Sequence, residues 1–313
     1  MKNVLLTGVA GFVGSKIAIS LLKKGYAVIG IDNLKTGYIA NIPRDVVFIN
    51  GDCAELATYE NAQLKEVDFD FIVHIAGQSS GEVSFDDPCL DLSDNCLSTL
   101  RLLEFAQTNS CKKFIYASTM SVYGEVDNGP IDEGHSTKPL SMYAVGKLAS
   151  ENYLRLFENY GIDSVSLRLF NIYGPGQNMS NLRQGMASIY IAQAIELGKI
   201  EVKGRPDRFR DLVFIDDVVR VIAQFMERDF EGSEVYNVCT GVKTKVADLV
   251  DLIKRTLGDE SLPVSFIEGT AGDQFGIVGD NTKLRSYLGD IKFTNLDRGI
   301  SKFISSLGVI EEK

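Results

Sequence analysis

Histidine is scarce in this chain, and its scarcity argues against a common kind of metal site. Only His74 and His135 occur among 313 residues, and the five cysteines show no C-x-x-C spacing. No cluster of cysteine and histidine suggests zinc. An odd number of cysteines also argues against a complete disulfide framework. We therefore expect no metal site and a reducing, cytoplasmic location.

The chain also lacks basic runs and long apolar segments. Lys and Arg number 32 against 42 Asp and Glu, which gives a net charge of −10, so no stripe of cations is available to follow a nucleic acid. No stretch reaches the roughly 18 uninterrupted apolar residues that a membrane span needs. The apolar start is interrupted by Gly8 and Gly11, which favours a first strand over a signal sequence. We expect neither nucleic acid nor membrane as a partner.

What the sequence does contain is an alternation of short β-rich runs with helical patterns. Its 45% hydrophobic content is enough for a substantial core. The candidate strands are Val4–Thr7, Ala27–Asp32, Val46–Asn50, Phe71–Ile75, Lys113–Ser118 and Ser164–Leu169. The candidate helices are Phe12–Lys24, Leu92–Asn109 and Ser141–Tyr160. This alternation is typical of βαβ units, so we predict an α/β fold with a Rossmann-type, doubly wound parallel sheet.

The rhythm changes after Asn171. The run Tyr173-Gly174-Pro175-Gly176-Gln177 breaks the pattern, and a helix candidate, Leu182–Leu197, follows without a strand before it. Strand and helix patterns resume at Val213–Ile215, Asp216–Arg228 and Val235–Val238. We therefore predict two discontinuous units, a larger one of residues 1–170 and about 209–241, and a smaller α/β one of about 171–208 and 242–313.

The first predicted strand leads into a glycine-rich loop, Thr7-Gly8-Val9-Ala10-Gly11-Phe12-Val13-Gly14. Such a loop lets the backbone turn tightly and approach a pyrophosphate, whose charge then faces the N-terminal end of the next helix. A side chain at Gly11 or Gly14 would obstruct this approach. Glycines that serve an ordinary βα turn are the alternative, and the loop alone does not exclude it.

The second predicted strand favours the dinucleotide site, because it ends at Asp32. A carboxylate there can accept both hydroxyls of an adenosine ribose, whereas a 2′-phosphate would meet like-charge repulsion, so we expect NAD rather than NADP. Lys35 can partly accommodate such a phosphate, although we expect it to be a solvated loop lysine. Asp52 is placed to reach the adenine amino group, but an aspartate in a turn needs no ligand, and both interpretations stay open.

A tyrosine and a lysine, Tyr143 and Lys147, stand four residues apart on one face of a predicted helix. A free phenol, with a pKa of about 10, is a poor base near neutrality, but a nearby ammonium and a positive nicotinamide can together lower that value. Such pairs are also common on helix surfaces. Here, however, a predicted strand delivers Ser118 and Thr119 to the carboxyl edge of the sheet, where open α/β folds bind ligands. Either hydroxyl can hydrogen-bond the substrate oxygen that Tyr143 deprotonates.

Over nearly its whole length the chain resembles the extended short-chain dehydrogenases/reductases of the nucleotide-sugar epimerase/dehydratase family, most of all UDP-glucose 4-epimerases. Besides the glycine loop, the motifs that carry the resemblance are Asp32-Asn33-Leu34, His74-Ile75-Ala76-Gly77, Tyr116 through Ser118-Thr119 to Tyr123-Gly124, Tyr143 to Lys147, Arg168 to Pro175, Arg210 to Asp217 and Tyr236-Asn237-Val238. This ordered set is much more specific for the family than for the sugar.

The resemblance implies a site and a reaction. Thr119, Tyr143 and Lys147 would form the catalytic set, with Lys147 also touching the nicotinamide ribose. Tyr143 would take the proton of the sugar 4-hydroxyl while NAD takes the hydride from C4, and in an epimerase the 4-keto sugar turns over before the hydride returns. The larger unit would bind NAD, the smaller one a nucleotide-diphosphate sugar, and helices 92–109 and 141–160 would form a homodimer interface.

The contacts that we assign follow the same resemblance. Those to NAD are Gly8, Gly11, Phe12, Val13, Asp32, Asn33, Asp52, Cys53, Ala76, Tyr143 and Lys147. Those to the substrate are Ser118, Thr119, Asn171 and Arg210, of which Asn171 and Arg210 would hold the diphosphate.

Two departures from the family pattern narrow the activity. Met120-Ser121 replaces the Asp-Glu pair of the dehydratases, and Ser121 replaces the Glu of related decarboxylases, so oxidation and reduction at C4 remain. Thr270 and Phe275 stand where relatives have a phosphate-binding Arg. Arg183 or Arg205 would then bind the phosphate, and the identity of the nucleotide base stays open. Our leading hypothesis is a 4-epimerase of the UDP-glucose/UDP-galactose type. The alternatives are a 4-dehydrogenase or 4-keto reductase with net hydride transfer, and a non-catalytic dinucleotide-binding regulator that would have no reason to keep the Tyr/Lys pair.

Overall fold

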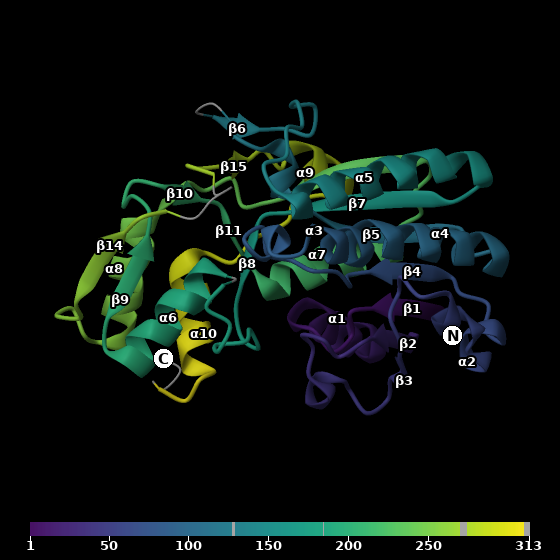
Figure 1. Cartoon of the computed structure of the whole chain (residues 1–313), viewed down its shortest axis with the longest axis horizontal. Coiled ribbons are helices and arrows are strands. Elements are labelled where there is room, and N and C mark those ends of the chain that lie inside the picture. The colour runs from purple at the N-terminus through teal and green to yellow at the C-terminus, as the bar shows by residue number, and fades with distance from the viewer. Residues whose placement is uncertain (127–128, 184, 270–273, 310–313) are drawn as a thin grey trace.

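The computed structural model describes residues 1–126, 129–183, 185–269 and 274–309. Its main element is a seven-stranded sheet of order β12-β7-β5-β4-β1-β2-β3, in which all neighbours run parallel (Figure 1). The strands are β1 (Asn3–Thr7), β2 (Ala27–Asp32), β3 (Val47–Asn50), β4 (Phe71–His74), β5 (Lys113–Thr119), β7 (Asp163–Leu169) and β12 (Ser233–Val238). The order reverses between β1 and β4, which confirms the predicted doubly wound sheet.

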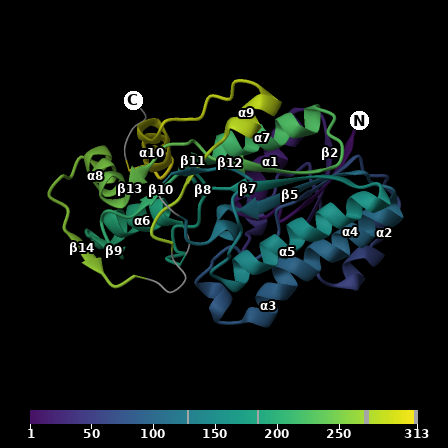
Figure 2. The same ribbon diagram turned by 90° about the horizontal axis from the view of Figure 1, so that it is seen from above.

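Helices cover both faces of this sheet (Figure 2). On one face lie α1 (Phe12–Lys23), α7 (Ile215–Glu227) and α9 (Thr282–Leu288), and on the other lie α4 (Ser98–Asn109) and α5 (Met142–Phe157), with the short α2 (Ala62–Lys65) and α3 (Pro88–Leu92) beside them. Because both faces are covered, strand residues such as Val4, Leu5 and Leu6 are fully buried. Within the described ranges, none of the helices combines the length and apolar character needed to cross a bilayer.

The helix that we expected over Leu92–Asn109 is divided. The helical region begins earlier than expected, with α3. Its N-cap Asp87 accepts a hydrogen bond from the Leu90 amide, and a proline stands in its first turn. A π-helical segment, Ser93–Leu97, follows and leads into α4. Such π-helical turns interrupt the regular spacing and often mark functional sites, and this one places Asp94 at the cavity described below.

The smaller unit lies beside the carboxyl edge of the large sheet (Figure 1). It contains α6 (Met186–Leu197), α8 (Val246–Leu257) and α10 (Leu296–Ser305). Four strand pairs accompany them: β8 (Asn171–Tyr173) with β11 (Leu212–Phe214), β9 (Ile200–Lys203) with β14 (Val264–Ile267), β10 (Phe209–Arg210) with β13 (Thr244–Lys245), and β6 (Pro130–Ile131) with β15 (Val278–Gly279). A strand, β8, thus comes before α6, and α6 begins at Met186 rather than at the expected Leu182.

The chain crosses between the two units more often than we predicted. Strand β12 returns to the large sheet, and α9 then packs against β12, so that Leu284 and Leu288 join the core of the large sheet. Residues 242–313 therefore contribute to both units before α10 completes the smaller core. The division into two domains stays a prediction, to which the structure adds this crossing.

A buried ion pair fastens α5 to the sheet. Glu151 on α5 accepts hydrogen bonds of 3.0 and 2.7 Å from the guanidinium of Arg168 on β7, and the two side chains are only 5% and 6% exposed. Ser118 on β5 donates its hydroxyl to the same carboxylate. Because Tyr143, Lys147 and Glu151 follow one another at intervals of four residues, this pair also orients the face of α5 that carries the expected catalytic residues.

Replacing Arg168 by methionine should therefore destabilise the protein. The substitution leaves the Glu151 charge buried without its partner, which typically lowers the free energy of unfolding by about 3–5 kcal/mol. Chemical denaturation measures this change, and Arg155→Met, at an exposed position of the same helix, provides the control. Equal stability of the two variants would contradict this account of the ion pair.

Candidate functional site

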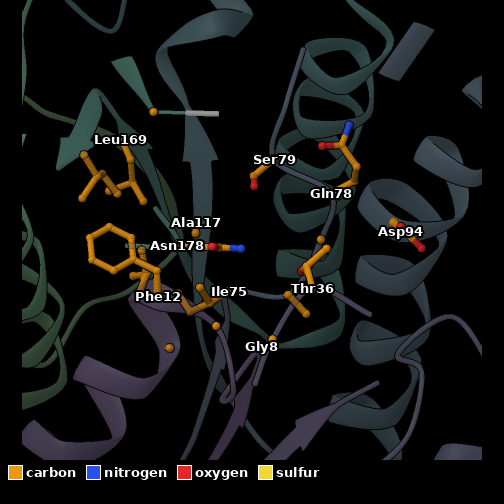
Figure 3. A pocket seen from close by; sticks show the side chains of 18 of the residues that line it. Gly8, Phe12, Thr36, Ile75, Gln78, Ser79, Asp94, Ala117, Leu169 and Asn178 are labelled. Carbon is orange, nitrogen blue, oxygen red and sulfur yellow. The ribbon is translucent and has the colours of Figure 1, made fainter. Parts of the chain in front are cut away.

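A cavity of about 1090 Å³ opens at the carboxyl edge of the large sheet. Its wall comes from the loop after β1, the ends of β2, β4, β5 and β7, and residues between 171 and 181 and from 185 to 187 of the smaller unit. In Figure 3, Phe12 and Leu169 lie on one side and Gln78 and Asp94 on the other. The volume is at the top of the range for ligand pockets, and the cavity lies at the edge where open α/β sheets bind ligands.

The glycine loop leads tightly into α1. Gly8 has a φ of +72°, and a Cβ there would lie 2.7 Å from the Ala76 nitrogen. A Cβ on Gly14 would lie 2.0 Å from the Gly8 carbonyl oxygen, whereas one on Gly11 would be 3.2 Å from it. Gly8 and Gly14 therefore tolerate a side chain less well than Gly11 does. The turn places Gly11, Phe12 and Val13, at the N-terminal end of α1, in the cavity wall, where a pyrophosphate would be stabilised.

Asp32 and Asp52 organise the adjacent part of the wall. Asp32 accepts the backbone N–H groups of Ala10 and Leu34 at 2.9 and 2.8 Å, and its two oxygens keep lone pairs for ribose hydroxyls. Asp52 accepts the Asn33 side-chain amide at 2.9 Å. Asp32, Asn33, Asp52, Cys53 and Ala76 were all expected near the cofactor. The structure brings these five residues to one cavity.

Lys35 is an exposed loop residue, as expected, and it also has an acidic partner within the chain. Its ammonium lies 3.2 Å from a carboxylate oxygen of Asp94 in the π-helical segment, and both residues line the cavity. Burial raises the pKa of Asp94, while Lys35 works in the opposite direction. The charge of Lys35 is thus compensated within the chain, which makes it less available to a 2′-phosphate and supports the preference for NAD.

The three expected catalytic residues meet at this cavity. Thr119, Tyr143 and Lys147 all line it, and Thr119 is close enough to the Tyr143 phenol to oppose the rise of its pKa. The Lys147 side chain is buried, donates to the Ala117 carbonyl at 3.0 Å, and has its nitrogen 6.0 Å from the centre of the Tyr143 ring. The arrangement can pass a proton between a substrate hydroxyl and the phenol, with a cation close by.

Burial sets the protonation of this pair. It raises the pKa of Tyr143 to about 12, against the effect of the Thr119 hydrogen bond and with the charge of Asp91 adding to the rise. It lowers the pKa of Lys147 to about 8, while Asp91 acts against the decrease. Near neutral pH the lysine is therefore largely charged, but the chain alone does not make Tyr143 a ready base. To lower the pKa of Tyr143 as we expected, Lys147 needs a further positive charge at the site.

Ser118 and Asn171 line the cavity but are partly engaged within the chain. The Ser118 hydroxyl donates to Glu151, and Thr119 is the hydroxyl residue that affects the pKa of Tyr143. The side-chain amide of Asn171 donates to the Asp211 carbonyl at 3.0 Å and keeps its oxygen and second N–H for other partners.

Arg210 is not brought to the cavity wall. Its guanidinium is buried and donates to the backbone carbonyls of Gln274 at 2.8 Å and Phe275 at 3.2 Å. Its assigned contact with the diphosphate stays a prediction, because binding would require it to exchange these hydrogen bonds. Thr270, which stands where relatives have a phosphate-binding Arg, lies outside the described residues.

The two alternative arginines have acidic partners. Arg183 contacts Asp86 at 2.7 Å and Glu82 at 3.3 Å, and Arg205 contacts Asp207 at 2.6 Å. Neither guanidinium is therefore presented as an uncompensated cation, and any role in phosphate binding requires rearrangement of an exposed ion pair.

Two features of the site were not predicted from the sequence. Tyr38 accepts a hydrogen bond of 3.1 Å from Asn178, and this contact joins the loop after β2 to the segment before α6 at the cavity. Asp91 is buried close enough to the reactive pair to affect both pKa values. No motif marks these residues, since their roles arise from contacts between distant segments. Among the described residues, no group of three or more His, Cys, Asp or Glu is placed to hold a metal ion.

The site geometry agrees with the comparisons with known proteins. Residues 4–239 match the NAD dependent epimerase/dehydratase family. The chain belongs to this family. The tight Gly8–Gly14 turn, the N-terminal end of α1 and the Asp32 carboxylate fit the phosphate and ribose groups of NAD, so the expected cofactor and the identification as an enzyme are confirmed.

The most similar relatives cover almost the whole chain. A putative UDP-glucose 4-epimerase of Methanocaldococcus jannaschii is 32% identical over 304 residues, covering 96% of this chain and 97% of that protein. A UDP-glucose 4-epimerase of Thermotoga maritima, solved with UDP-glucose, has a TM-score of 0.92 at 32% identity and 98% coverage of both chains. The Thermus thermophilus enzyme, solved with NAD, has a TM-score of 0.90 at 31% identity and covers 98% of this chain and 99% of its own.

Relatives with other sugars in their names also match. A UDP-glucuronate 4-epimerase of Thermodesulfobacterium geofontis is 28% identical and covers 83% of this chain and 82% of its own. A UDP-N-acetylglucosamine 4-epimerase of Methanobrevibacter ruminantium is 26% identical, with a TM-score of 0.89 and 98% coverage of both chains. Epimerisation at C4 is common to these relatives, while the sugar differs. The individual contacts assigned to NAD and substrate stay predictions.

Replacing Gly14 by alanine should weaken NAD binding at least about tenfold, or by about 1.4 kcal/mol. The new Cβ would lie 2.0 Å from the Gly8 carbonyl oxygen and would force the phosphate-binding turn open. Calorimetric titration of nucleotide-free protein measures the affinity. Gly134→Ala is the control, because its Cβ would meet only a flexible Asp132 carboxylate at 3.3 Å. Unchanged NAD affinity in the Gly14 variant would refute the assigned role of the turn.

Proposed function

We propose that this protein interconverts the C4 epimers of a UDP-sugar of the UDP-glucose and UDP-galactose type. The observation that carries the proposal is the convergence of Thr119, Tyr143 and Lys147 on one cavity in a chain 32% identical to UDP-glucose 4-epimerases over nearly its full length. Only this similarity supports the choice of sugar and nucleotide base. Relatives named for other sugars match as well, so the cavity residues alone do not select the sugar.

The residues of the chain have distinct roles in this reaction. Tyr143, aligned by Thr119, takes the proton of the sugar 4-hydroxyl and returns it after the 4-keto sugar has turned over. Lys147 stabilises the phenolate through its charge. When bound, NAD accepts and returns the hydride at C4, and its positive ring adds to the charge that favours the phenolate.

The neighbouring positions support C4 oxidation and reduction over elimination. Met120 and Ser121 line the cavity directly after Thr119, and neither can act as the acid that removes water in a dehydratase. The alternative, a 4-dehydrogenase or 4-keto reductase, would use the same three residues with net hydride transfer. Its distinguishing feature is consumption of the cofactor.

Substrate contacts differ in how readily the chain can provide them. We retain Thr119 and Asn171 as direct contacts because both line the cavity. Ser118 and Arg210 would first have to exchange their hydrogen bonds to Glu151 and to the Gln274 and Phe275 carbonyls. A charged fork such as Arg210 suits diphosphate oxygens well enough to compensate for that exchange.

We also propose a homodimer in the cytoplasm. Exposed apolar side chains gather on α3, the π-helical segment and α5, namely Leu90, Leu92, Leu97, Val145 and Leu156. Leu103 on α4 and Leu154 on α5 point into the core and do not contribute to this surface. A second copy of the chain is the occupant that we propose for this surface. The cytoplasmic location rests on five cysteines without disulfides.

Incubation with UDP-glucose, UDP-galactose and their N-acetyl and glucuronate forms, without added reductant, tests the activity. We expect interconversion of at least one C4 pair, with flat absorbance at the reduced-nicotinamide band because NAD is regenerated in each cycle. A steady rise or fall of that band with turnover would favour the net oxidoreductase. If no sugar in the panel changes configuration at C4, the epimerase proposal fails.

Tyr143→Phe is the matched variant for this assay. Loss of the phenol should lower kcat by about 10²–10⁴-fold, the usual contribution of a positioned acid or base. Tyr160→Phe, at an exposed position after the same helix, should retain full activity. Unaltered turnover in the Tyr143 variant would revive the non-catalytic interpretation.

Sedimentation should give the mass of a dimer. A charge placed in the apolar surface, Val145→Glu, should shift the equilibrium toward monomer because it buries an unpaired carboxylate at the interface. Leu197→Glu, at an exposed leucine of the smaller unit, should not. A monomeric mass for the native chain at micromolar concentration would contradict the dimer.

A further inference from the structure

A buried polar cluster lies beside the catalytic helix and has no role in the reaction described above. Asp91 on α3 is 1% exposed, and its Oδ1 accepts hydrogen bonds from Gln78 at 2.9 Å and from Asn95 at 3.1 Å. The second oxygen of Asp91, Oδ2, and the Oδ1 of Asn95 are buried without a hydrogen-bond partner among the described residues. Buried acceptors without donors are costly and uncommon in native proteins, and they often indicate a function.

Two glycines bring this cluster close to Lys147. A Cβ on Gly146 would lie 3.2 Å from the Asn95 Cβ and 3.7 Å from Asp91 Oδ2, so α5 packs directly over the pair. A Cβ on Gly77 would lie 2.5 Å from Asn95 Oδ1 and 3.4 Å from the Lys147 nitrogen. Asn95 is therefore the neighbour of both the buried carboxylate and the buried ammonium.

Asp91 and Lys147 act on each other through their charges. Burial lowers the pKa of Lys147 to about 8, and the negative charge of Asp91 opposes the decrease. Burial likewise raises the pKa of Asp91, and Lys147 opposes this after the hydrogen bonds from Gln78 and Asn95. Without the carboxylate, burial would bring the lysine still closer to neutrality at physiological pH.

The other titratable groups around Lys147 do not supply this charge. Burial lowers the pKa of His74 on β4 and raises that of Tyr116 on β5, so both are neutral near pH 7. Tyr143 on α5 is itself the group to be ionised. The remaining carboxylates nearby are already paired, Asp94 with Lys35 and Glu151 with Arg168.

We propose that Asp91, held by Gln78 and Asn95, is a positioning residue that keeps Lys147 charged beside Tyr143. The inference rests on the proposed function, in which the lysine charge stabilises the phenolate. Asp91 does not touch the substrate and acts through Lys147. The unpartnered oxygen of Asp91 lowers the free energy of unfolding. Such losses of stability are common at residues that serve activity.

Asp91→Asn in the full chain with NAD tests this proposal. Asparagine has the same shape and can still accept from Gln78 and Asn95 through Oδ1, so the variant removes the charge alone. We expect kcat at pH 7.5 to fall about threefold, because a decrease of about one unit from a Lys147 pKa of about 8 reduces the charged fraction about threefold, with KM for the sugar nucleotide within about twofold of the native value. We also expect the pH profile of kcat to move about one unit toward lower pH, because Lys147 and Tyr143 both lose a negative neighbour.

Asp87→Asn is the matched control. It removes the same charge from the exposed N-cap of the same helix, and asparagine caps a helix as well as aspartate does. Its pH profile should coincide with that of the native enzyme. A profile of Asp91→Asn that also coincides with the native one would overturn the proposal.

Thermal unfolding provides a second measurement that does not depend on turnover. A carboxyl group whose pKa is higher in the folded than in the unfolded chain lowers stability at pH values above that pKa. Asp91→Asn should therefore melt at the same or a higher temperature than the native protein at pH 7.5. A lower melting temperature would indicate a purely structural role and would also overturn the proposal. If the native chain epimerises no sugar, the proposed function fails, whereas this measurement still judges the role of Asp91.

Discussion

The buried ammonium of Lys147 is the feature on which the rest of the site depends. A lysine only 4% exposed is strongly disfavoured in its charged form, and the role as a base that we propose for Tyr143 requires that form beside it. The chain meets this requirement with local partners. The Ala117 carbonyl accepts a hydrogen bond from the ammonium at 3.0 Å, and the Tyr116 ring lies 4.9 Å from it.

The surrounding packing serves the same requirement from two sides of α5. On the sheet side, the Glu151–Arg168 pair ties the helix to β7 and, through Ser118, to β5, so Thr119 and Tyr143 keep their relative positions. On the other side, α3 and the π-helical segment approach closely because residue 146 is a glycine. The first contact gives rigidity, and the second brings a carboxylate near the ammonium.

The architecture and much of the site were predictable from the sequence because they depend on local patterns. The alternation of strand and helix patterns predicted the parallel sheet, and the positions of Asp32 and Thr119 at strand ends placed them at the ligand edge. The π-helical segment was not predictable, because its residues have ordinary helical character and only packing produces the wider turn. The pairing of Lys35 with Asp94, 59 residues apart, and the turning of Arg210 toward Gln274 and Phe275 depend on tertiary contacts that no local pattern records.

The loop after β2 bears on the choice between an epimerase and a net oxidoreductase. It is joined to the π-helical segment through Lys35 and Asp94 and to the segment before α6 through Tyr38 and Asn178. Each contact is exposed and individually weak, but both hold the loop that begins directly after Asp32, the last residue of β2. A net oxidoreductase must open this region in every cycle to exchange its cofactor. An epimerase has no such need, because its cofactor is regenerated in place, and contacts that hold this loop are compatible with such an enzyme.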